Sequence, residues 1–208
     1  MAPGRFISVE GIDGAGKSTQ IAALADRLVA RGHEVMRSRE PGGSPGAEMI
    51  RRLLVEGDPD RWSPETEILL FTAARRDHLE RTILPALARG AVVLSDRFAD
   101  STRVYQGAAR ADLRATVDAL HRLMIGIEPD LTLVLDMDPA AALTRGLARA
   151  SGEDRFEDMG LGFQQRLRAG FRALAADEPG RVALIDAGRA PEVIGAEIDA
   201  LLAERLGL

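Results

Sequence analysis

The 208-residue sequence contains no cysteine, so disulfide bonds, thiolate metal ligands and cysteine nucleophiles are all excluded. It also has no apolar run that approaches the roughly 20 residues needed to span a bilayer. The opening residues lack the apolar core and the cleavage site of a signal peptide. From these absences we expect a soluble, cytoplasmic protein that has no membrane as a partner.

An excess of positive charge is absent as well. The formal net charge is -5 at pH 7, which argues against a nucleic-acid polymer as the main partner. The three histidines, His33, His78 and His121, are too scattered to form a local metal-binding pair. With 46% hydrophobic residues the chain can build a sizeable core, and we expect a single domain over residues 1–208.

Lysine is nearly absent: among 27 lysines and arginines it occurs once, at Lys17. Lys17 belongs to the stretch GIDGAGKS, which fits the phosphate-loop motif G-x-x-x-x-G-K-[ST] and stands between an apolar run and a helical pattern. Glycines let the backbone amides of such a loop converge on a polyphosphate, and the following helix adds its positive N-terminal end. The residues predicted to bind the donor nucleotide are Gly11, Ile12, Asp13, Gly14, Ala15, Gly16, Lys17, Ser18 and Thr19.

The use of lysine rather than arginine at position 17 has a chemical reason. A compact ammonium group on a flexible stem fits inside a ring of loop amides and reaches the β- and γ-phosphate oxygens, whereas a planar guanidinium group is too wide. The neighbouring hydroxyl of Ser18 is predicted to bind Mg²⁺. A phosphate loop therefore predicts nucleotide binding, but it does not define the reaction.

Short apolar runs alternate with helical patterns along the whole chain. This alternation predicts an α/β fold with a parallel five-stranded sheet flanked by helices. The runs lie at residues 5–10, 33–39, 91–96, 131–136 and 181–186.

Between these runs, apolar stripes and loop signals indicate the helices. Residues 40–90 are too many for one crossover, and we predict two or three helices there, one beginning at about Pro64. A charged segment over about 145–158 is interpreted either as a mobile lid or as a solvated loop. The stripes predicted to pack in the core are Ile21, Leu24, Ala25 and Leu28 in the first helix, and Val193, Ile194, Ile198, Leu201 and Leu202 in the last.

Four further clusters follow the phosphate loop, and in this order they resemble the thymidylate kinase family along nearly the whole chain. The resemblance implies a P-loop NTPase fold with a lid, and Mg²⁺-dependent transfer of the ATP γ-phosphoryl group to dTMP. The products would be ADP and dTDP, in dTTP biosynthesis. It also implies a homodimer formed through helices that flank the acceptor site. The clusters are REPGG at 39–43, FTAAR at 71–75, DRF at 96–98 and DSTRVYQG at 100–107.

The DRF cluster ends the third predicted strand, where ligands of open α/β sheets bind. An arginine there can hold a monophosphate with two hydrogen bonds and stabilise charge during phosphoryl transfer. The resemblance implies that Arg97 and Arg51 contact the acceptor phosphate. It further implies that Asp96 helps to organise Mg²⁺ and that Asp13 reaches the sugar 3′-hydroxyl.

Residues for the acceptor base are expected on the helix that carries FTAAR. Phe71 and Arg75 are four residues apart and therefore share one helix face. The ring can stack on a flat base while the guanidinium group donates to a carbonyl edge, which suits thymine with O4 as the acceptor. By the resemblance, Gln106 and Thr102 complete the base contacts, and Tyr105 packs against the sugar so that deoxyribose is favoured.

Thymidylate kinases differ in whether a catalytic arginine lies in the phosphate loop or in the lid. The loop has Gly14 at that position, so the chain resembles the bacterial type, with lid arginines that close over the transferred group. The candidates are Arg145, Arg149 and Arg155, and Arg145 is alternatively expected to stack on adenine. The family usually has Tyr or His where this chain has Phe98, so any hydrogen bond from that ring is absent.

Two alternatives remain open at this point. The first is another nucleoside monophosphate kinase, such as one for dUMP or dCMP, because one base methyl group is worth only about 1–3 kcal/mol in a hydrophobic pocket. The second is a GTPase-like switch that binds nucleotide and a partner protein. Against the switch, the sequence contains no asparagine and so no N-K-x-D motif for reading guanine.

Overall fold

The computed structural model describes residues 3–57, 61–110, 112–147 and 160–208, and for 108–110 and 145–147 it describes the backbone alone. Strands are β1 Arg5–Glu10, β2 Val35–Arg39, β3 Val92–Asp96, β4 Leu131–Asp136 and β5 Val182–Asp186. Helices are α1 Lys17–Ala30, α2 Pro45–Val55, α3 Pro64–His78, α4 Leu84–Ala88, α5 Ala99–Val104, α6 Arg114–Met124, α7 Pro139–Leu147, α8 Gly160–Asp177 and α9 Pro191–Leu206, with π-helical segments η1 Leu79–Ile83 and η2 Tyr105–Arg110.

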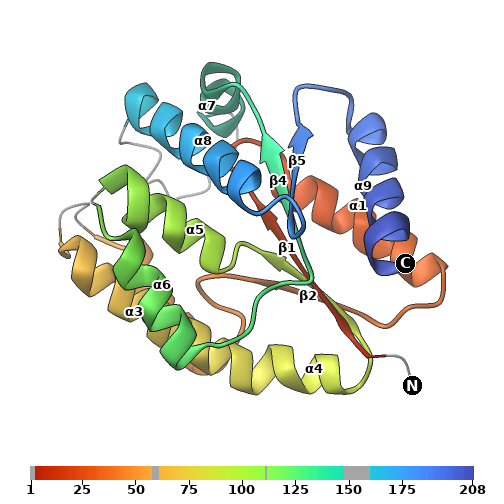
Figure 1. Ribbon diagram of the computed structural model, residues 1–208, viewed down its shortest axis with the longest axis horizontal. Helices are drawn as coiled ribbons and strands as arrows, with labels where there is room; N and C mark the ends of the chain where they lie inside the picture. Colours follow the sequence, from red (N-terminus) through yellow and green to blue (C-terminus); the bar gives the residue numbers. More distant parts are fainter. Residues whose placement is uncertain (1–2, 58–60, 111, 148–159) are drawn as a thin grey trace.

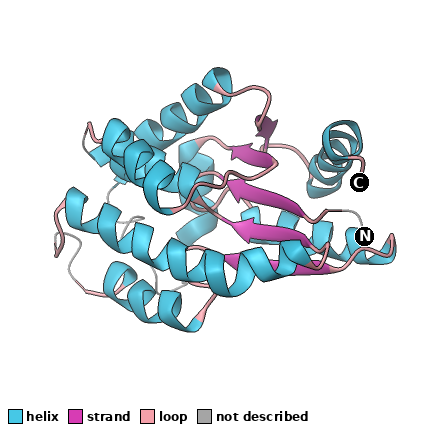
Figure 2. Cartoon of the chain, turned by 60° about the horizontal axis from the view of Figure 1, so that its bottom comes forward, coloured by secondary structure: helices cyan, strands magenta, loops and turns pink. Residues whose placement is uncertain are grey.

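The five strands form one parallel sheet in the order β2-β3-β1-β4-β5. Helices lie on both sides of this sheet (Figure 2). Because both faces are covered, β1, β3 and β4 are almost wholly buried, and β3 and β4 are apolar along most of their length. The predicted fold class and the five strands are confirmed, with β2, β3 and β5 beginning one or two residues later than the apolar runs.

Helices α1 and α9 cover one side of the sheet, while α4, α5 and α8 lie on the other (Figure 1). The predicted stripe of α1 is confirmed, since Ile21, Leu24, Ala25 and Leu28 are all buried. Each fully buried aliphatic side chain of leucine size stabilises the fold by roughly 1.5–3 kcal/mol. The stripe is what fixes α1 against the sheet.

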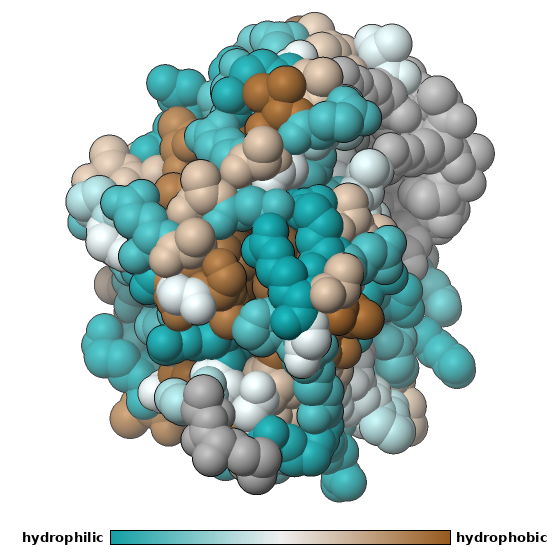
Figure 3. All heavy atoms as spheres, turned by 90° about the vertical axis from the view of Figure 1, so that its right-hand side faces the viewer, coloured by the Kyte–Doolittle hydropathy of each residue, from teal (hydrophilic) through white to brown (hydrophobic). Residues whose placement is uncertain are grey.

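The stripe predicted for the last helix is partly wrong. Ile194, Ile198 and Leu202 of α9 are buried, and Leu201 is half-buried, but the Val193 side chain is 48% exposed. Val193 lies in the first turn of α9. The face of the molecule seen in Figure 3 is mostly hydrophilic, with hydrophobic residues in small groups.

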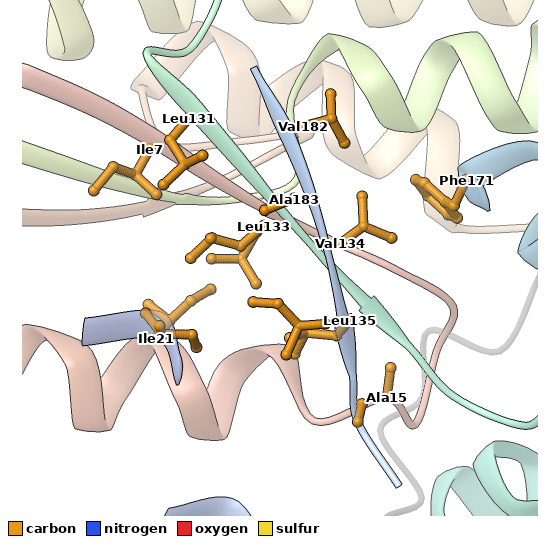
Figure 4. Close-up of a cluster of buried hydrophobic side chains, with 14 of the residues drawn as sticks. Ile7, Ala15, Ile21, Leu131, Leu133, Val134, Leu135, Phe171, Val182 and Ala183 are labelled. Carbon is orange, nitrogen blue, oxygen red and sulfur yellow. The ribbon is translucent and has the colours of Figure 1, made fainter. Parts of the chain in front are cut away.

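The largest core cluster joins the sheet to helices from both sides. Figure 4 shows side chains of β4 and β5, among them Leu133, Leu135 and Ala183, together with Ile21 of α1 and Phe171 of α8. A second cluster lies between β3 and the η1–α4 segment. These two clusters hold the strands rigidly and so fix where their carboxyl ends lie.

The described residues of 40–57 and 61–90 form three α-helices and the π-helical segment η1, which agrees with the prediction of two or three helices. Helix α3 begins at Pro64, as predicted, because Pro64 suits a first helical position and Ser63 caps the helix by accepting a hydrogen bond from the Thr66 amide. Among the described residues, no helix has the length and apolar character needed to cross a membrane.

Candidate active site

The phosphate loop connects β1 to α1 at the carboxyl edge of the sheet. Gly16 has a φ of 95° and ends the loop just before Lys17 begins α1. The Lys17 ammonium donates to the carbonyl oxygens of Gly11 and Ile12, at 3.1 Å each. Burial lowers the pKa of Lys17, and the neighbouring Arg97 guanidinium lowers it further. The ammonium group of the chain's only lysine is therefore bound by the carbonyl oxygens of its own loop.

Helix α7 packs directly against the loop. A Cβ atom at Gly14 would lie 2.1 Å from the Ala142 carbonyl oxygen, and φ at Gly14 is 81°. Both the close approach and the left-handed backbone exclude a side chain at this position. The structure thus gives a steric reason for the missing loop arginine.

The two residues predicted to bind a metal ion lie together. Asp96 ends β3, and the parallel pairing of Val9 with Asp96 sets it beside the start of the loop. The Ser18 hydroxyl donates to the Asp96 carboxylate at 3.2 Å. Among the described residues, no three histidine, cysteine or acidic side chains gather into a metal site.

Arg97 adopts a left-handed backbone, with a φ of 71°, the only positive φ of a non-glycine residue in the described part of the chain. This turn directs its guanidinium group across the loop, where it forms an ion pair with Asp13 and donates to the Gly11 carbonyl. Burial raises the pKa of Asp13, but Arg97 and Lys17 outweigh it and bring that pKa down to about 2. Asp13 is therefore a carboxylate at neutral pH.

Glu10 stabilises the turn at Arg97 through hydrogen bonds to the residues that follow it. Its fully buried carboxylate accepts hydrogen bonds from the Phe98 amide at 2.7 Å and from the Ser101 hydroxyl at 2.6 Å. Ser101 in turn accepts a hydrogen bond from Arg97 at 3.0 Å. Burial raises the pKa of Glu10 to about 7, and the nearby Asp100 carboxylate also raises it.

A pocket opens beside Asp13 and Arg97. Its walls come from the phosphate loop, α2, α3, the end of β3 with α5, η2 and the 40–41 turn. The lining residues are Asp13, Glu40, Pro41, Arg51, Val55, Phe71, Arg75, Arg97, Phe98, Ser101, Thr102, Tyr105 and Gln106.

Arg75 is held from three directions at the floor of this pocket. Its guanidinium group donates to Glu40 at 2.7 Å, to the Phe98 carbonyl at 3.2 Å and to the Thr102 hydroxyl at 3.0 Å. It also lies over the Phe98 ring, 5.1 Å from its centre. Thr102, which we expected to contact a base, contacts Arg75 here.

Gln106 is held by a second buried carboxylate. Its amide nitrogen donates to Glu67 at 3.1 Å, and both side chains are almost completely buried. Next to Gln106 in η2, the Tyr105 ring has its centre 5.1 Å from the Arg97 guanidinium group. Arg51 donates to the Pro41 carbonyl, which ties α2 to the turn after β2.

A second pocket lies on the other side of the phosphate loop, between the loop, α1 and the segment joining β5 to α9. Gln20 of α1 donates from its amide to the Pro191 carbonyl at 3.0 Å and so ties this segment to α1. The residues that line the pocket are Gly14, Ala15, Gly16, Thr19, Gln20, Ala187, Arg189, Pro191 and Ile194.

Comparison with known proteins decides between the classes of nucleotide-binding protein that carry such a loop. The family described as thymidylate kinase matches residues 9–198. This chain belongs to the thymidylate kinase family. A curated thymidylate kinase of Jannaschia sp. is 67% identical over 98% of both chains, and one of Caulobacter vibrioides is 56% identical over the full length of both.

A solved thymidylate kinase structure from Ehrlichia chaffeensis superposes with a TM-score of 0.79 at 31% identity, covering 97% of this chain and all of that one. The chain is accordingly a nucleoside monophosphate kinase, which is a phosphotransferase, and its five-stranded sheet is that of a P-loop NTPase. The GTPase-like alternative is not favoured by these matches.

The structure brings most of the residues predicted for a thymidylate kinase site into one place. The eight residues expected to bind the acceptor all line the first pocket: Asp13, Arg51, Phe71, Arg75, Arg97, Thr102, Tyr105 and Gln106. The lid arginines are a different case. The backbone of Arg145 belongs to α7, whereas Arg149 and Arg155 lie outside the described residues.

Sequence reasoning missed the carboxylates that hold these side chains, namely Glu10, Glu40 and Glu67. All three are buried in the structure. A signal was present for two of them, because Glu10 stands between a predicted strand and the phosphate loop, and Glu40 separates a strand from a Pro-Gly turn. Gln20, in the helix after the loop, was missed as well.

Proposed function

We propose that this protein transfers the γ-phosphoryl group of ATP to dTMP, giving ADP and dTDP, with the help of Mg²⁺. The observation that carries the proposal is the acceptor pocket, whose wall includes Asp13 of the phosphate loop and Arg97. A monophosphate held in this pocket would lie next to the donor phosphates held by Lys17. In-line transfer requires this adjacency of donor and acceptor.

For the donor, we propose that the loop amides and Lys17 hold the phosphates of ATP. Lys17 would exchange its two loop carbonyls for phosphate oxygens, which are stronger acceptors for a charged donor. The pocket beyond the loop, lined by Gln20 and Arg189, has room for the adenine base. Arg145, Arg149 and Arg155 stay predictions for the lid.

The residues at the metal position fit Mg²⁺. This ion usually takes one or two protein oxygens, several waters and phosphate oxygens of the substrate, rather than a cage of carboxylates. Ser18 and Asp96 offer a hydroxyl and a carboxylate oxygen 3.2 Å apart at the end of the loop. When bound, Mg²⁺ would offset the negative charge of the donor phosphates.

For the acceptor, we propose that Arg97 and Arg51 bind the phosphate of dTMP. Arg97 carries its guanidinium group on a fixed turn, so little conformational freedom is lost on binding. Phe71 would stack on thymine while Arg75 donates to O4, and Asp13 would accept from the 3′-hydroxyl. The acceptor phosphate is already an anion, so no general base is assigned.

A panel assay tests the proposed reaction. ADP release is followed with ATP, Mg²⁺ and, in turn, dTMP, dUMP, dCMP, dGMP and dAMP as acceptors. We expect dTMP to have the highest kcat/KM, with some turnover of dUMP because only a methyl group separates the two bases. A different best acceptor would contradict the dTMP assignment, and release of ADP with no acceptor would contradict transfer.

We also propose that the protein is a homodimer through α2, α3 and α6. Helix α3 packs against both α2 and α6. Large apolar side chains on these helices are strongly exposed, with Met49 at 70%, Leu69 at 58% and Leu123 at 77%. Exposed apolar side chains on helices that pack against one another support an interaction surface there.

The remaining partner assignments are proposals from the sequence. A net charge of -5 supports small-molecule substrates over a nucleic-acid polymer. A cytoplasmic location also stays a prediction.

A further inference from the structure

Glu67 and Gln106 form a buried pair at the wall of the acceptor pocket. Glu67 is 0% exposed and Gln106 is 1% exposed, and the Gln106 amide nitrogen donates to the Glu67 carboxylate at 3.1 Å. A carboxylate only accepts hydrogen bonds, whereas a glutamine amide has one donor end and one acceptor end. The pairing therefore fixes which end of Gln106 turns toward Glu67, and the other end of the amide is the carbonyl oxygen, an acceptor.

Arg75 is fixed in the same way on the same floor of the pocket. Its partners are the Glu40 carboxylate, the Phe98 carbonyl and the Thr102 hydroxyl. A guanidinium group can only donate. Arg75 thus presents a donor to the pocket, while Gln106, held by Glu67, presents an acceptor.

From this arrangement we propose that Glu67 is a positioning residue that determines base specificity, by turning the carbonyl oxygen of Gln106 toward the base. The inference rests on the proposed binding of the acceptor base between Phe71 and Arg75. Glu67 itself is not a lining residue of the pocket, so it acts through Gln106.

The donor and acceptor pattern matches one class of pyrimidine. Thymine and uracil present an acceptor at O4 and a donor at N3, which complement Arg75 and the Gln106 carbonyl. Cytosine presents the reverse, an amino donor at C4 and an acceptor at N3. In a buried site, unmatched polar groups of this kind are strongly disfavoured because neither can turn to water. Glu67 thereby excludes cytosine at N3, and Arg75 excludes it at C4.

The test is the substitution Glu67→Gln, assayed with dTMP, dUMP and dCMP. A glutamine at position 67 can accept from Gln106 or donate to it, so the Gln106 amide becomes free to turn over. The preference for dUMP over dCMP in kcat/KM should then fall by about 5- to 150-fold, the range that corresponds to one unmatched buried group. The preference for dTMP over dUMP should stay unchanged, because both bases have the same N3 and O4. Where dCMP turnover is too slow, its inhibition constant against dTMP gives the same comparison.

Two further variants keep the test decisive. Glu67→Met removes the acceptor at similar length and should lower the same ratio if Glu67→Gln does not fold. Asp77→Asn changes another carboxylate of α3, one that accepts from Ser44 and the Ala47 amide, and should leave the ratio unchanged. An equal loss of activity with all three nucleotides, or an unchanged ratio of dUMP to dCMP in both Glu67 variants, would overturn the proposal.

The same assays distinguish a wrong acceptor assignment from a wrong role of Glu67. If the wild-type protein shows no preference for dTMP and dUMP over dCMP, the assignment of the acceptor is wrong irrespective of Glu67. If wild-type preference is strong and the Glu67 variants keep it, the acceptor assignment stands and only the role of Glu67 is wrong.

Discussion

The hydroxyl of Ser18 lies 3.2 Å from the carboxylate of Asp96, although 78 residues separate them in the chain. Parallel pairing of β1 with β3 creates this proximity, because it aligns Val9 with Asp96 and so sets the end of β3 beside the start of the phosphate loop. The two predicted metal ligands are thus neighbours in the folded protein.

Asp96→Asn should raise the Mg²⁺ concentration needed for half-maximal activity, since the site loses a negative oxygen ligand. Ser18→Ala should have the same effect, because the hydroxyl ligand is lost. The measurement is a Mg²⁺ titration of ADP release at saturating ATP and dTMP. Ser101→Ala, which alters a hydroxyl in contact with Arg97 but not with Asp96, is the control and should keep the wild-type Mg²⁺ dependence. An unchanged titration in both test variants would remove the pair from metal binding.

Lys17→Arg should lower kcat by at least about 100-fold while the protein stays folded. The wider guanidinium group cannot enter the ring of loop amides, so transition-state charge on the phosphates is left without its point charge. Steady-state kinetics measure the loss, and circular dichroism checks the fold. The matched control is Arg27→Lys in the same helix, which bonds to Asp199 far from the loop and should be close to wild type. Near-normal turnover in Lys17→Arg would contradict the role given to the lysine.

Arg75→Ala should raise the KM for dTMP by about 10-fold or more and leave the KM for ATP nearly unchanged, because a charged hydrogen bond to the base is lost. The variant should also have a lower Tm, since Glu40 is left buried without its cation. Kinetics are therefore measured well below that Tm. Arg76→Ala, the next residue but about half exposed, is the control and should match wild type in both KM values. Equal changes in both KM values of Arg75→Ala would place this residue outside the base site.

The raised pKa of Glu10 predicts that the stability of the fold depends on pH. Its folded pKa of about 7 lies above the ordinary value of 4.5, because of burial and the Asp100 carboxylate. The folded state then binds more protons than the unfolded state between these values, so the contribution of Glu10 is present below pH 4.5 and is lost as pH rises through 7. Glu10→Gln removes this titration.

The free energy of unfolding of wild type, taken relative to Glu10→Gln, should fall by on the order of 3 kcal/mol between pH 4.5 and pH 8. Urea unfolding of both proteins at several pH values measures it. Ser8→Ala in the same strand removes a buried hydrogen bond to Thr132 but no ionisable group. Its effect should not vary with pH. A constant difference between wild type and Glu10→Gln would show that Glu10 does not titrate in this range.

The proposed homodimer can be tested by introducing charged residues into the proposed interface. Light scattering of the wild type should give twice the chain mass of 22.3 kDa. Leu69→Glu and Leu123→Glu should give monomers, since a buried unpaired charge in the interface is strongly unfavourable. Val29→Glu adds the same charge at an exposed position of α1 and should stay dimeric. A monomeric wild type would end this proposal.

The sequence by itself determined the elements and the donor loop. Apolar alternation and the G-x-x-x-x-G-K-[ST] spacing are local patterns, so β1, α1 and the place of Lys17 could be predicted from neighbouring residues alone. The same holds for Phe71 and Arg75, because a spacing of four sets two side chains on one helix face. Val193 was predicted wrongly, since an apolar residue in the first turn of a helix need not face the core.

Only the tertiary structure decided what surrounds the functional side chains. The strand order and the left-handed turn at Arg97 are not local patterns of the sequence. Arg75 bonds to the Phe98 carbonyl, 23 positions away, and Gln106 bonds to Glu67, 39 positions away. A buried carboxylate such as Glu67 looks in the sequence like any charged residue of a helix. Burial next to Gln106, away from the surface, makes Glu67 able to fix the direction of a hydrogen bond.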